Sequence, residues 1–235
     1  MKKFWGVGNV SVRALKQLKE GNVRYLVRKD SKKFLDFLKK RCLNGRLNLL
    51  AWIVLTCSSE TIKYVFERLK GEFENGSEEN RKLIEEKILT VSPSTAKKKE
   101  RIEHVVVKRE EACLALEKFF KEGFLNVNVR EYKHGETPLH RAVREGNLKV
   151  IKMLIDWGAN VNDNGYLIDE KTGKRKGSGN TPLYLAIVKR KPEIAKLLLQ
   201  HGADPEEIRE KEGISIREIA RLLGYKELEE ILKTA

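Results

Sequence analysis

Two segments of this chain are copies of each other. Residues 137–160 read TPLHRAVREGNLKVIKMLIDWGAN and residues 181–204 read TPLYLAIVKRKPEIAKLLLQHGAD, so the two align over their whole length without a gap. A unit of this size has an apolar face that it cannot bury alone, and such units become stable only by stacking on their neighbours. The repeat therefore constrains the fold more strongly than any other feature of the sequence.

Each copy carries the signals of two helices and a closing turn. In the first copy, Thr137 can cap a helix that begins at Pro138, where the missing N–H of proline costs nothing. Gly158 fits the left-handed conformation that often ends a helix, and the second copy has the same residue types at these three places. Between them lies an apolar stripe at helical spacing. The stripe consists of Val150, Ile151, Leu154 and Ile155 in the first copy and of Ile194, Ala195, Leu198 and Leu199 in the second.

The pattern resembles the ankyrin repeat. The resemblance rests on Thr-Pro-Leu-His at the start of a short helix, a second apolar helix, and Gly-Ala-Asn or Gly-Ala-Asp at the end, and it covers residues 124–235. Residues 213–232 resemble a C-terminal capping repeat, although Ile216 stands where proline is usual. The resemblance implies an all-α fold: an ankyrin-repeat solenoid of stacked helix pairs with short β-hairpin fingers, after a helical and diverged N-terminal part. It also implies that His140 is a structural residue that hydrogen-bonds within its own repeat.

The spacing between the two copies exceeds the usual period of the family. Thr137 and Thr181 are 44 residues apart, whereas an ankyrin repeat has about 33 residues. The 11 extra residues fall where the family places the hairpin between repeats, so we predict an extended hairpin at about residues 163–179. Two interpretations stay open. The insertion is either a neutral surface loop, which proteins accept at little cost, or a contact finger with a basic tip.

The repeat pattern weakens toward the N-terminus. Residues 48–69 align without a gap with residues 137–158, and residues 112–129 match the second half of a repeat in their apolar positions. Between these segments we predict an inserted helix capped by Ser77, and before them a helix capped by Ser31. The predicted parts are a basic helical segment at 1–46, degenerate ankyrin-like helix pairs at 47–123, and an ankyrin-repeat domain at 124–235 that ends in a capping repeat at 213–235.

The composition predicts a folded protein of the cytoplasm. Hydrophobic residues make up 40% and charged residues 35% of the chain, a balance typical of soluble folded domains. The longest strongly apolar run, residues 47–57, is too short to span a bilayer, and we recognise no signal peptide. Cys42, Cys57 and Cys113 are too few and too scattered for a disulfide framework or a zinc site. We interpret them as buried thiols in a reducing, intracellular setting.

The sequence offers no arrangement of residues for catalysis. The four histidines lack metal-ligand spacing, and the chain has no phosphate-binding loop and no serine in a nucleophile elbow. We therefore predict a protein that is not an enzyme and needs no cofactor or metal. We expect no association with membranes and a monomer in the absence of a partner.

Surface recognition is the function that the resemblance implies. Ankyrin stacks bind protein partners with their concave face, which the first helices line, and with their hairpin tips. Carried over position by position, the predicted partner-binding residues are Tyr132, Lys133, His134, Glu136, Arg144, Glu145, Asn180, Val188 and Lys189, with Lys171, Lys174, Arg175 and Lys176 on the inserted hairpin. Tyr132 is the best candidate for an anchor, because aromatic side chains dominate the energetics of interfaces.

The distribution of charge supports a second hypothesis. Residues 1–70 contain 17 Lys and Arg against 5 Asp and Glu, a net charge of +12, whereas the remaining 165 residues have a net charge of +2. A basic segment of this kind can bind phosphates, so the alternative function is that of a nucleic-acid-associated adaptor. The candidate residues for that contact are Lys32, Lys33, Lys39, Lys40 and Arg41. The competing interpretation is a solvated face or a contact for an acidic protein.

Overall fold

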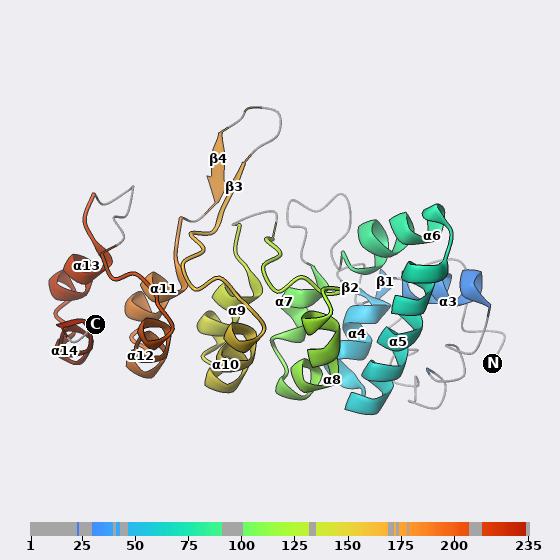
Figure 1. The fold of residues 1–235 in the computed structure, drawn as a ribbon, viewed down its shortest axis with the longest axis horizontal. Helices are drawn as coiled ribbons and strands as arrows, with labels where there is room; N and C mark the ends of the chain where they lie inside the picture. Colours follow the sequence, from blue (N-terminus) through green and yellow to red (C-terminus); the bar gives the residue numbers. More distant parts are fainter. Residues whose placement is uncertain are drawn as a thin grey trace. The chain divides into compact units, whose positions relative to one another are not determined.

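The chain divides into two compact units, Met1–Leu125 and Asn126–Ala235. The computed structural model describes residues 23, 30–39, 41–42, 47–90, 101–131, 135–168, 172, 174–177, 179–206 and 213–233. Helices predominate in both units, and the strands among the described residues form only two short antiparallel ladders (Figure 1). The predicted all-α class with short β-hairpins is thereby confirmed.

The first unit is built from helices that pack in pairs. Its elements in chain order are α3 (Ser31–Leu38), β1 (Arg41–Cys42), β2 (Leu47–Asn48), α4 (Leu49–Thr56), α5 (Ser59–Asn75), α6 (Glu78–Leu83), the π-helix η1 (Ile84–Ile88), α7 (Ile102–Val106) and α8 (Glu110–Lys121). Helix α4 packs against α7, and α5 packs against α8. In the second contact the rings of Phe66 and Phe119 meet with centroids 5.8 Å apart. The first and second helices of one pair thus face the corresponding helices of the next, as in a repeat array.

Polar side chains fix where two of these helices begin. Asn48 is fully buried, and its Oδ1 accepts a hydrogen bond from the N–H of Ala51 at 3.0 Å. Its Nδ2 donates to the carbonyl of Ile88 at 2.5 Å, so this one side chain caps α4 and also satisfies the end of η1. Ser77 caps α6 as predicted, because its Oγ accepts from the N–H of Asn80 at 3.2 Å.

The predicted cap of α3 is wrong. The helix already includes Ser31, and the capping residue is Asp30, whose Oδ1 accepts from the N–H of Lys33 at 3.0 Å. Aspartate caps helices as well as serine does, and its negative charge also interacts favourably with the positive end of the helix dipole. The capping group is therefore the carboxylate of Asp30, one residue before the predicted serine.

The second unit consists of three stacked helix pairs. Its elements are α9 (Pro138–Glu145), α10 (Leu148–Asp156), β3 (Tyr166–Ile168), β4 (Arg175–Gly177), α11 (Pro182–Val188), α12 (Pro192–Gln200), α13 (Ile216–Leu222) and α14 (Lys226–Lys233). Each first helix packs on its own second helix, α11 packs between α9 and α13, and α12 packs against α14. The pairs follow one another from yellow to red in Figure 1. This unit therefore has the predicted arrangement of stacked helix pairs.

The core of the second unit lies between these helices. The predicted stripe positions that are buried are Val150, Ile151, Leu154, Ile194, Ala195 and Leu198. The last predicted position of each stripe, Ile155 and Leu199, is only half-buried. In the second copy Leu197 is buried instead of Leu199, because Leu197 lies three residues after Ile194 and so on the same face of α12.

The inserted residues between the first two repeats form a β-hairpin. Strands β3 and β4 pair antiparallel, with Tyr166 opposite Gly177, Leu167 opposite Lys176 and Ile168 opposite Arg175. The hairpin projects away from the helix pairs of its unit (Figure 1). Both strands lie within the segment predicted from the excess spacing, although the proposed division of the whole chain into three parts stays a prediction.

Candidate binding surface

The described residues of the predicted surface lie on the first helices, on the loops next to them, and on the hairpin. Among them, Glu145, Lys174, Val188 and Lys189 are exposed, Arg144 and Asn180 are half-buried, and Glu136 is buried. Tyr132, Lys133, His134 and Lys171 lie outside the described residues, as do the side chains of Arg175 and Lys176, whose backbones form part of β4. The surface is therefore built here from the first helices and the residues that hold them.

Hydroxyl caps place the first helices in register. Thr137, Thr181 and Ser215 precede α9, α11 and α13. The Oγ1 of Thr181 accepts from the N–H of Tyr184 at 3.3 Å, and the Oγ of Ser215 accepts from the N–H of Glu218 at 3.2 Å. Because the helices start at equivalent residues and pack on one another, a given position after the cap lies on the same side of each repeat.

His140 joins the first repeat to the second. Its Nδ1 accepts from the N–H of Thr137 at 3.1 Å, so its Nε2 carries the proton and donates to the carbonyl of Asn180 at 2.7 Å. Burial lowers the pKa of His140, and this outweighs the nearby carboxylates of Asp163 and Glu136, which act in the opposite direction. The imidazole is therefore a neutral structural group. The prediction from the sequence included its bond within the repeat and missed its bond to the next one.

Both arginines of α9 are paired with carboxylates. The guanidinium of Arg144 donates to both carboxylate oxygens of Glu136, with Nε 3.1 Å from Oε1 and 3.0 Å from Oε2. On the same helix, Nε of Arg141 lies 2.9 Å from Oε1 of Glu145. A partly exposed pair such as Arg141 and Glu145 contributes about 1 kcal/mol or less to stability. The consequence of both pairs for recognition is larger, because a partner would have to displace one charge to reach the other.

A lysine from the second repeat caps α9. The Nζ of Lys191 lies 2.9 Å from the carbonyl oxygen of Val143 and 2.8 Å from that of the next residue, and these carbonyls at the end of a helix lack helical partners. Burial lowers the pKa of Lys191. In the first unit, Nη1 of Arg109 takes the same role at the end of α4, 3.2 Å from the carbonyl of Val54 and 2.6 Å from that of Cys57. Neither contact has a sequence spacing that would have predicted it.

Asparagines link the loops of successive repeats. Asn128 donates from Nδ2 to the carbonyl of Gly158 at 3.1 Å and accepts at Oδ1 from the N–H of Asn160 at 2.8 Å. One repeat further on, Asn162 donates from Nδ2 to the carbonyl of Gly202 at 2.8 Å and accepts at Oδ1 from the N–H of Asp204 at 2.9 Å. The recurring Asn-x-Asn in these loops was a usable signal that the sequence reasoning missed.

Arg190 holds the end of α11 in an unusual conformation. Its φ is +53°, whereas the equivalent residue of the first repeat is Gly146, with a φ of +84°. The left-handed region costs a residue other than glycine about 1–2 kcal/mol. The guanidinium carbon of Arg190 lies 4.1 Å from the centroid of the Tyr225 ring, a cation–π contact that offsets part of this cost. The contact joins the second repeat to the third.

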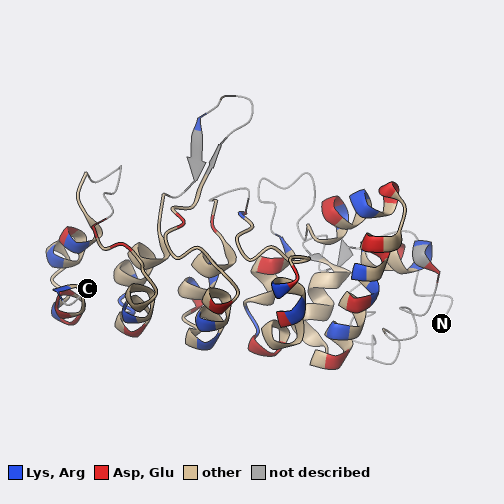
Figure 2. Cartoon of the chain, viewed as in Figure 1, with Lys and Arg blue, Asp and Glu red and all other residues tan. Residues whose placement is uncertain are grey.

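The basic residues proposed for nucleic acid are described only in part. Lys33 pairs with Asp30 at 2.6 Å and Lys39 pairs with Asp36 at 2.6 Å, both at exposed positions of α3. Lys32 is exposed, Lys40 lies outside the described residues, and of Arg41 only the backbone, in β1, is described. In the described parts of each unit, many helices carry both positive and negative side chains (Figure 2).

The remaining features of the described residues concern membranes, metals and thiols. None of their helices is long and apolar enough to cross a membrane, and none of their His, Cys, Asp and Glu side chains cluster in a way that could hold a metal ion. Cys57 and Cys113 are buried free thiols, as predicted. Burial raises the pKa of Cys113 to about 12, so this thiol stays protonated and unreactive at neutral pH. The side chain of Cys42 is not described.

Comparison with known proteins identifies the repeats. The Ankyrin repeat family model matches residues 134–166 and 178–210. Protein phosphatase 1 regulatory subunit 27 of Homo sapiens is 32% identical over 99 residues, which are 42% of this chain and 56% of that protein. Rabankyrin-5 of Mus musculus is 29% identical over 85 residues, 36% of this chain and 6% of that protein.

A third relative is an enzyme of which only a small part matches. The 2-5A-dependent ribonuclease of Homo sapiens is 35% identical over 86 residues, which are 37% of this chain and 10% of that protein. The chain thus spans little more than half of one of these relatives and a tenth or less of the other two. The residues that the family model matches are ankyrin repeats, and they all lie in the second unit of this chain.

Proposed function

We propose that this chain is a non-enzymatic module that binds a partner protein through the exposed side of its first helices and through its hairpin tips. The observation that carries the proposal is the contrast between constant and variable positions in the second unit. The cap position is Thr, Thr and Ser in the three repeats, whereas the position seven residues later is Arg144, Val188 and Leu222. A fixed framework that presents a different side chain at the same position of each repeat is suited to recognition rather than to catalysis.

The relatives support an interaction role without naming the partner. One of them is named a regulatory subunit, and such a subunit acts by assembling with another protein. The ribonuclease match covers a tenth of that enzyme, so it gives no reason to assign nuclease chemistry to this chain. The identity of the partner, the cytoplasmic location and the monomeric state of the free chain stay predictions.

Affinity capture with the full chain tests the proposal. The bait is compared with a variant that carries Val188→Glu and Lys174→Glu on the proposed surface, and with a control that carries Lys152→Glu and Lys196→Glu on the second helices. All four positions are exposed, so neither pair should disturb the fold. We expect partner proteins that the first variant loses and the control retains. Equal recovery by all three baits would contradict the proposal.

The alternative function is binding of nucleic acid by residues 1–70. The net charge of +12 in this segment, against +2 in the rest of the chain, favours it. The two ion pairs of α3 are exposed, and phosphates can compete with such weak pairs. A gel-shift titration at low salt, with the full chain and with a variant in which Lys32, Lys33, Lys39 and Lys40 are changed to Glu, decides between the two. No shift of duplex or single strand by the unchanged chain would rule this function out.

A further inference from the structure

Three exposed apolar side chains lie at the C-terminal ends of α11 and α13. Their exposed fractions are 41% for Val188, 69% for Leu222 and 41% for Leu223, and Leu222 is the most exposed large apolar side chain among the described residues. Val188 and Leu222 each follow their helix cap by seven residues. Because α11 packs against α13, these two side chains come from the same turn of neighbouring first helices. Exposed apolar side chains that lie together mark interaction sites more often than scattered ones do.

Two cations that form no ion pair with the described residues adjoin this apolar group in the sequence. The first helices of the second unit and the residues that end them carry seven Lys and Arg side chains. Five of these have partners. Arg141 pairs with Glu145, Arg144 with Glu136 and Arg217 with Glu206. Arg190 contacts the ring of Tyr225, and Lys191 bonds to carbonyl oxygens at the end of α9. Lys189 and Arg221 are exposed and form no ion pair with any described residue. Lys189 directly follows Val188, and Arg221 directly precedes Leu222.

This inference rests on the proposed function. We propose that the second and third repeats form a docking surface for a segment of the partner protein that is acidic and contains apolar anchor residues. The surface consists of Val188, Leu222 and Leu223, with Lys189 and Arg221 beside them. Apolar anchors would cover the three exposed side chains, and carboxylates would pair with Lys189 and Arg221. Opposite charges of this kind steer association and fix the register of the bound segment.

The first repeat marks the boundary of this surface. Its residue at the position of Val188 and Leu222 is Arg144, whose guanidinium is held by both oxygens of Glu136. That side chain offers neither an apolar contact nor a free charge. The docking surface therefore belongs to the second and third repeats, and the inserted hairpin between the first and second is not required for it.

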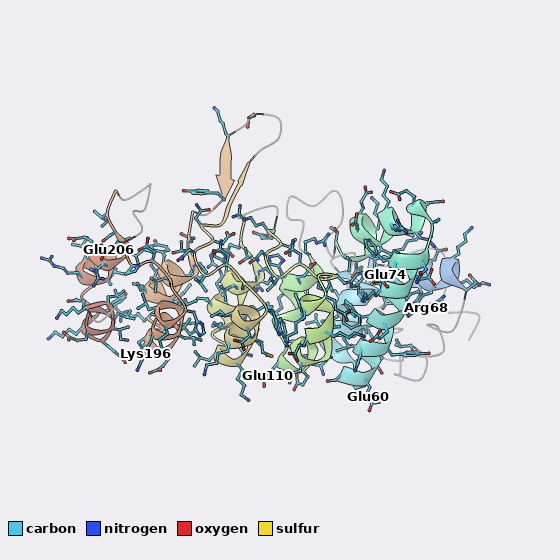
Figure 3. All side chains as sticks on the ribbon, viewed as in Figure 1. Glu60, Arg68, Glu74, Glu110, Lys196 and Glu206 are labelled. Atoms are coloured by element: carbon cyan, nitrogen blue, oxygen red, sulfur yellow. The ribbon has the colours of Figure 1, made fainter. Side chains whose placement is uncertain are left out.

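A peptide of stated chemistry tests the surface with the full chain. The probe is a fluorescein-labelled peptide GDELLDELLDEG, and its binding is measured by fluorescence anisotropy at low and high salt. Two further peptides, GKKLLKKLLKKG and GDESSDESSDEG, separate the contribution of charge from that of the leucines. The surface variants are Leu222→Ser and Arg221→Glu. The matched controls are Leu148→Ser on α10, a leucine that is 37% exposed, and Lys196→Glu on α12 (Figure 3).

We expect the acidic leucine peptide to bind better than either other peptide, and more weakly at high salt because the charges are screened. Leu222→Ser should weaken its binding by about tenfold or more, as for a central interface residue. Arg221→Glu should weaken it as well and shift the preference toward the lysine peptide. Both controls should bind like the unchanged chain. Circular dichroism checks that each variant is folded.

Several outcomes would overturn the inference. These are an absence of binding, equal binding of the lysine peptide by the unchanged chain, or an equal loss in the control variants. Self-association of the chain that Leu222→Ser abolishes would also overturn it, because a second copy would then be the occupant. If affinity capture recovers a partner that Leu222→Ser and Arg221→Glu both retain, this inference fails while the proposed function stands.

Discussion

The pH dependence of stability tests the role of His140 most sharply. The ring is fully buried, accepts from the backbone N–H of Thr137 and donates to the carbonyl of Asn180. A second proton would have to sit on Nδ1 and point at the N–H of Thr137, where it would replace an attraction by a repulsion. Burial already lowers the pKa of His140. The folded state therefore resists protonation that the unfolded chain accepts, and stability must fall as the pH drops.

The magnitude follows from linkage. An exposed histidine in the unfolded chain has a pKa of about 6.5. Above that value neither state binds the proton and the stability from this group is fully present. Below it the unfolded state gains the proton and the folded state does not, so the free energy of unfolding falls by up to about 1.4 kcal/mol per pH unit. Between pH 7 and pH 5 the loss from His140 alone is therefore at most about 2 kcal/mol.

Urea titrations followed by the fluorescence of Trp157, in a background in which Trp5 and Trp52 are changed to Phe, measure this term. Unfolding free energies are obtained from pH 7 to pH 5 for the unchanged chain, for His140→Gln and for the control His201→Gln, in which an exposed histidine is removed. We expect His140→Gln to be less stable at pH 7, since it loses a buried hydrogen-bonded ring, but to depend less on pH. The control should parallel the unchanged chain. Parallel curves for all three proteins would show that His140 is not held neutral by the fold.

Three further predictions concern the second unit and are measured by urea titration. Leu154→Ala should cost about 2–5 kcal/mol because it opens a cavity in the core, whereas Lys174→Ala on the hairpin should change stability by less than about 0.5 kcal/mol; an equal loss would show that the hairpin is structural. Arg190→Gly should be nearly neutral, since relief of the left-handed conformation balances loss of the cation–π contact, but should stabilise a Tyr225→Ala background by about 1 kcal/mol; a destabilising effect in that background would contradict the balance. Asn162→Ala should cost about 1 kcal/mol through its two hydrogen bonds to the next repeat, and no loss would mean that water replaces them.

The sequence predicted those parts of the structure that depend on local rules. The helix starts at Thr137 and Thr181, the helix ends at Gly158 and Gly202, and the buried stripes all follow from caps, left-handed turns and helical spacing. These rules were reliable here because the two copies align without a gap and carry the same signals at equivalent positions. The insertion was found in the same way, since only a repeat with a known period reveals extra residues.

The contacts between repeats could not be predicted, because they obey no spacing. Lys191 and Arg109 each directly precede the second helix of their own pair and bond to the end of the first helix of the preceding pair, but the two contacts span 48 and 55 residues of the chain. Arg190 occupies a conformation that favours glycine, and the reason lies in Tyr225, more than thirty residues away. The exposed surface presented a related difficulty. Glu136 looked available from its position, but Arg144 holds it in a buried ion pair.

The inserted hairpin shows how a repeat array can gain residues without losing its stacking. The contacts that join the first repeat to the second lie on both sides of the insertion: His140 reaches the carbonyl of Asn180, and Lys191 reaches the end of α9. The hairpin begins at Tyr166 and ends at Gly177, and these two residues pair with each other in the ladder. A segment whose ends are already held together adds little loop-closure entropy. The hairpin can therefore vary in length and charge while the first helices keep their register, so the finger and the docking surface on the second and third repeats are free to change independently.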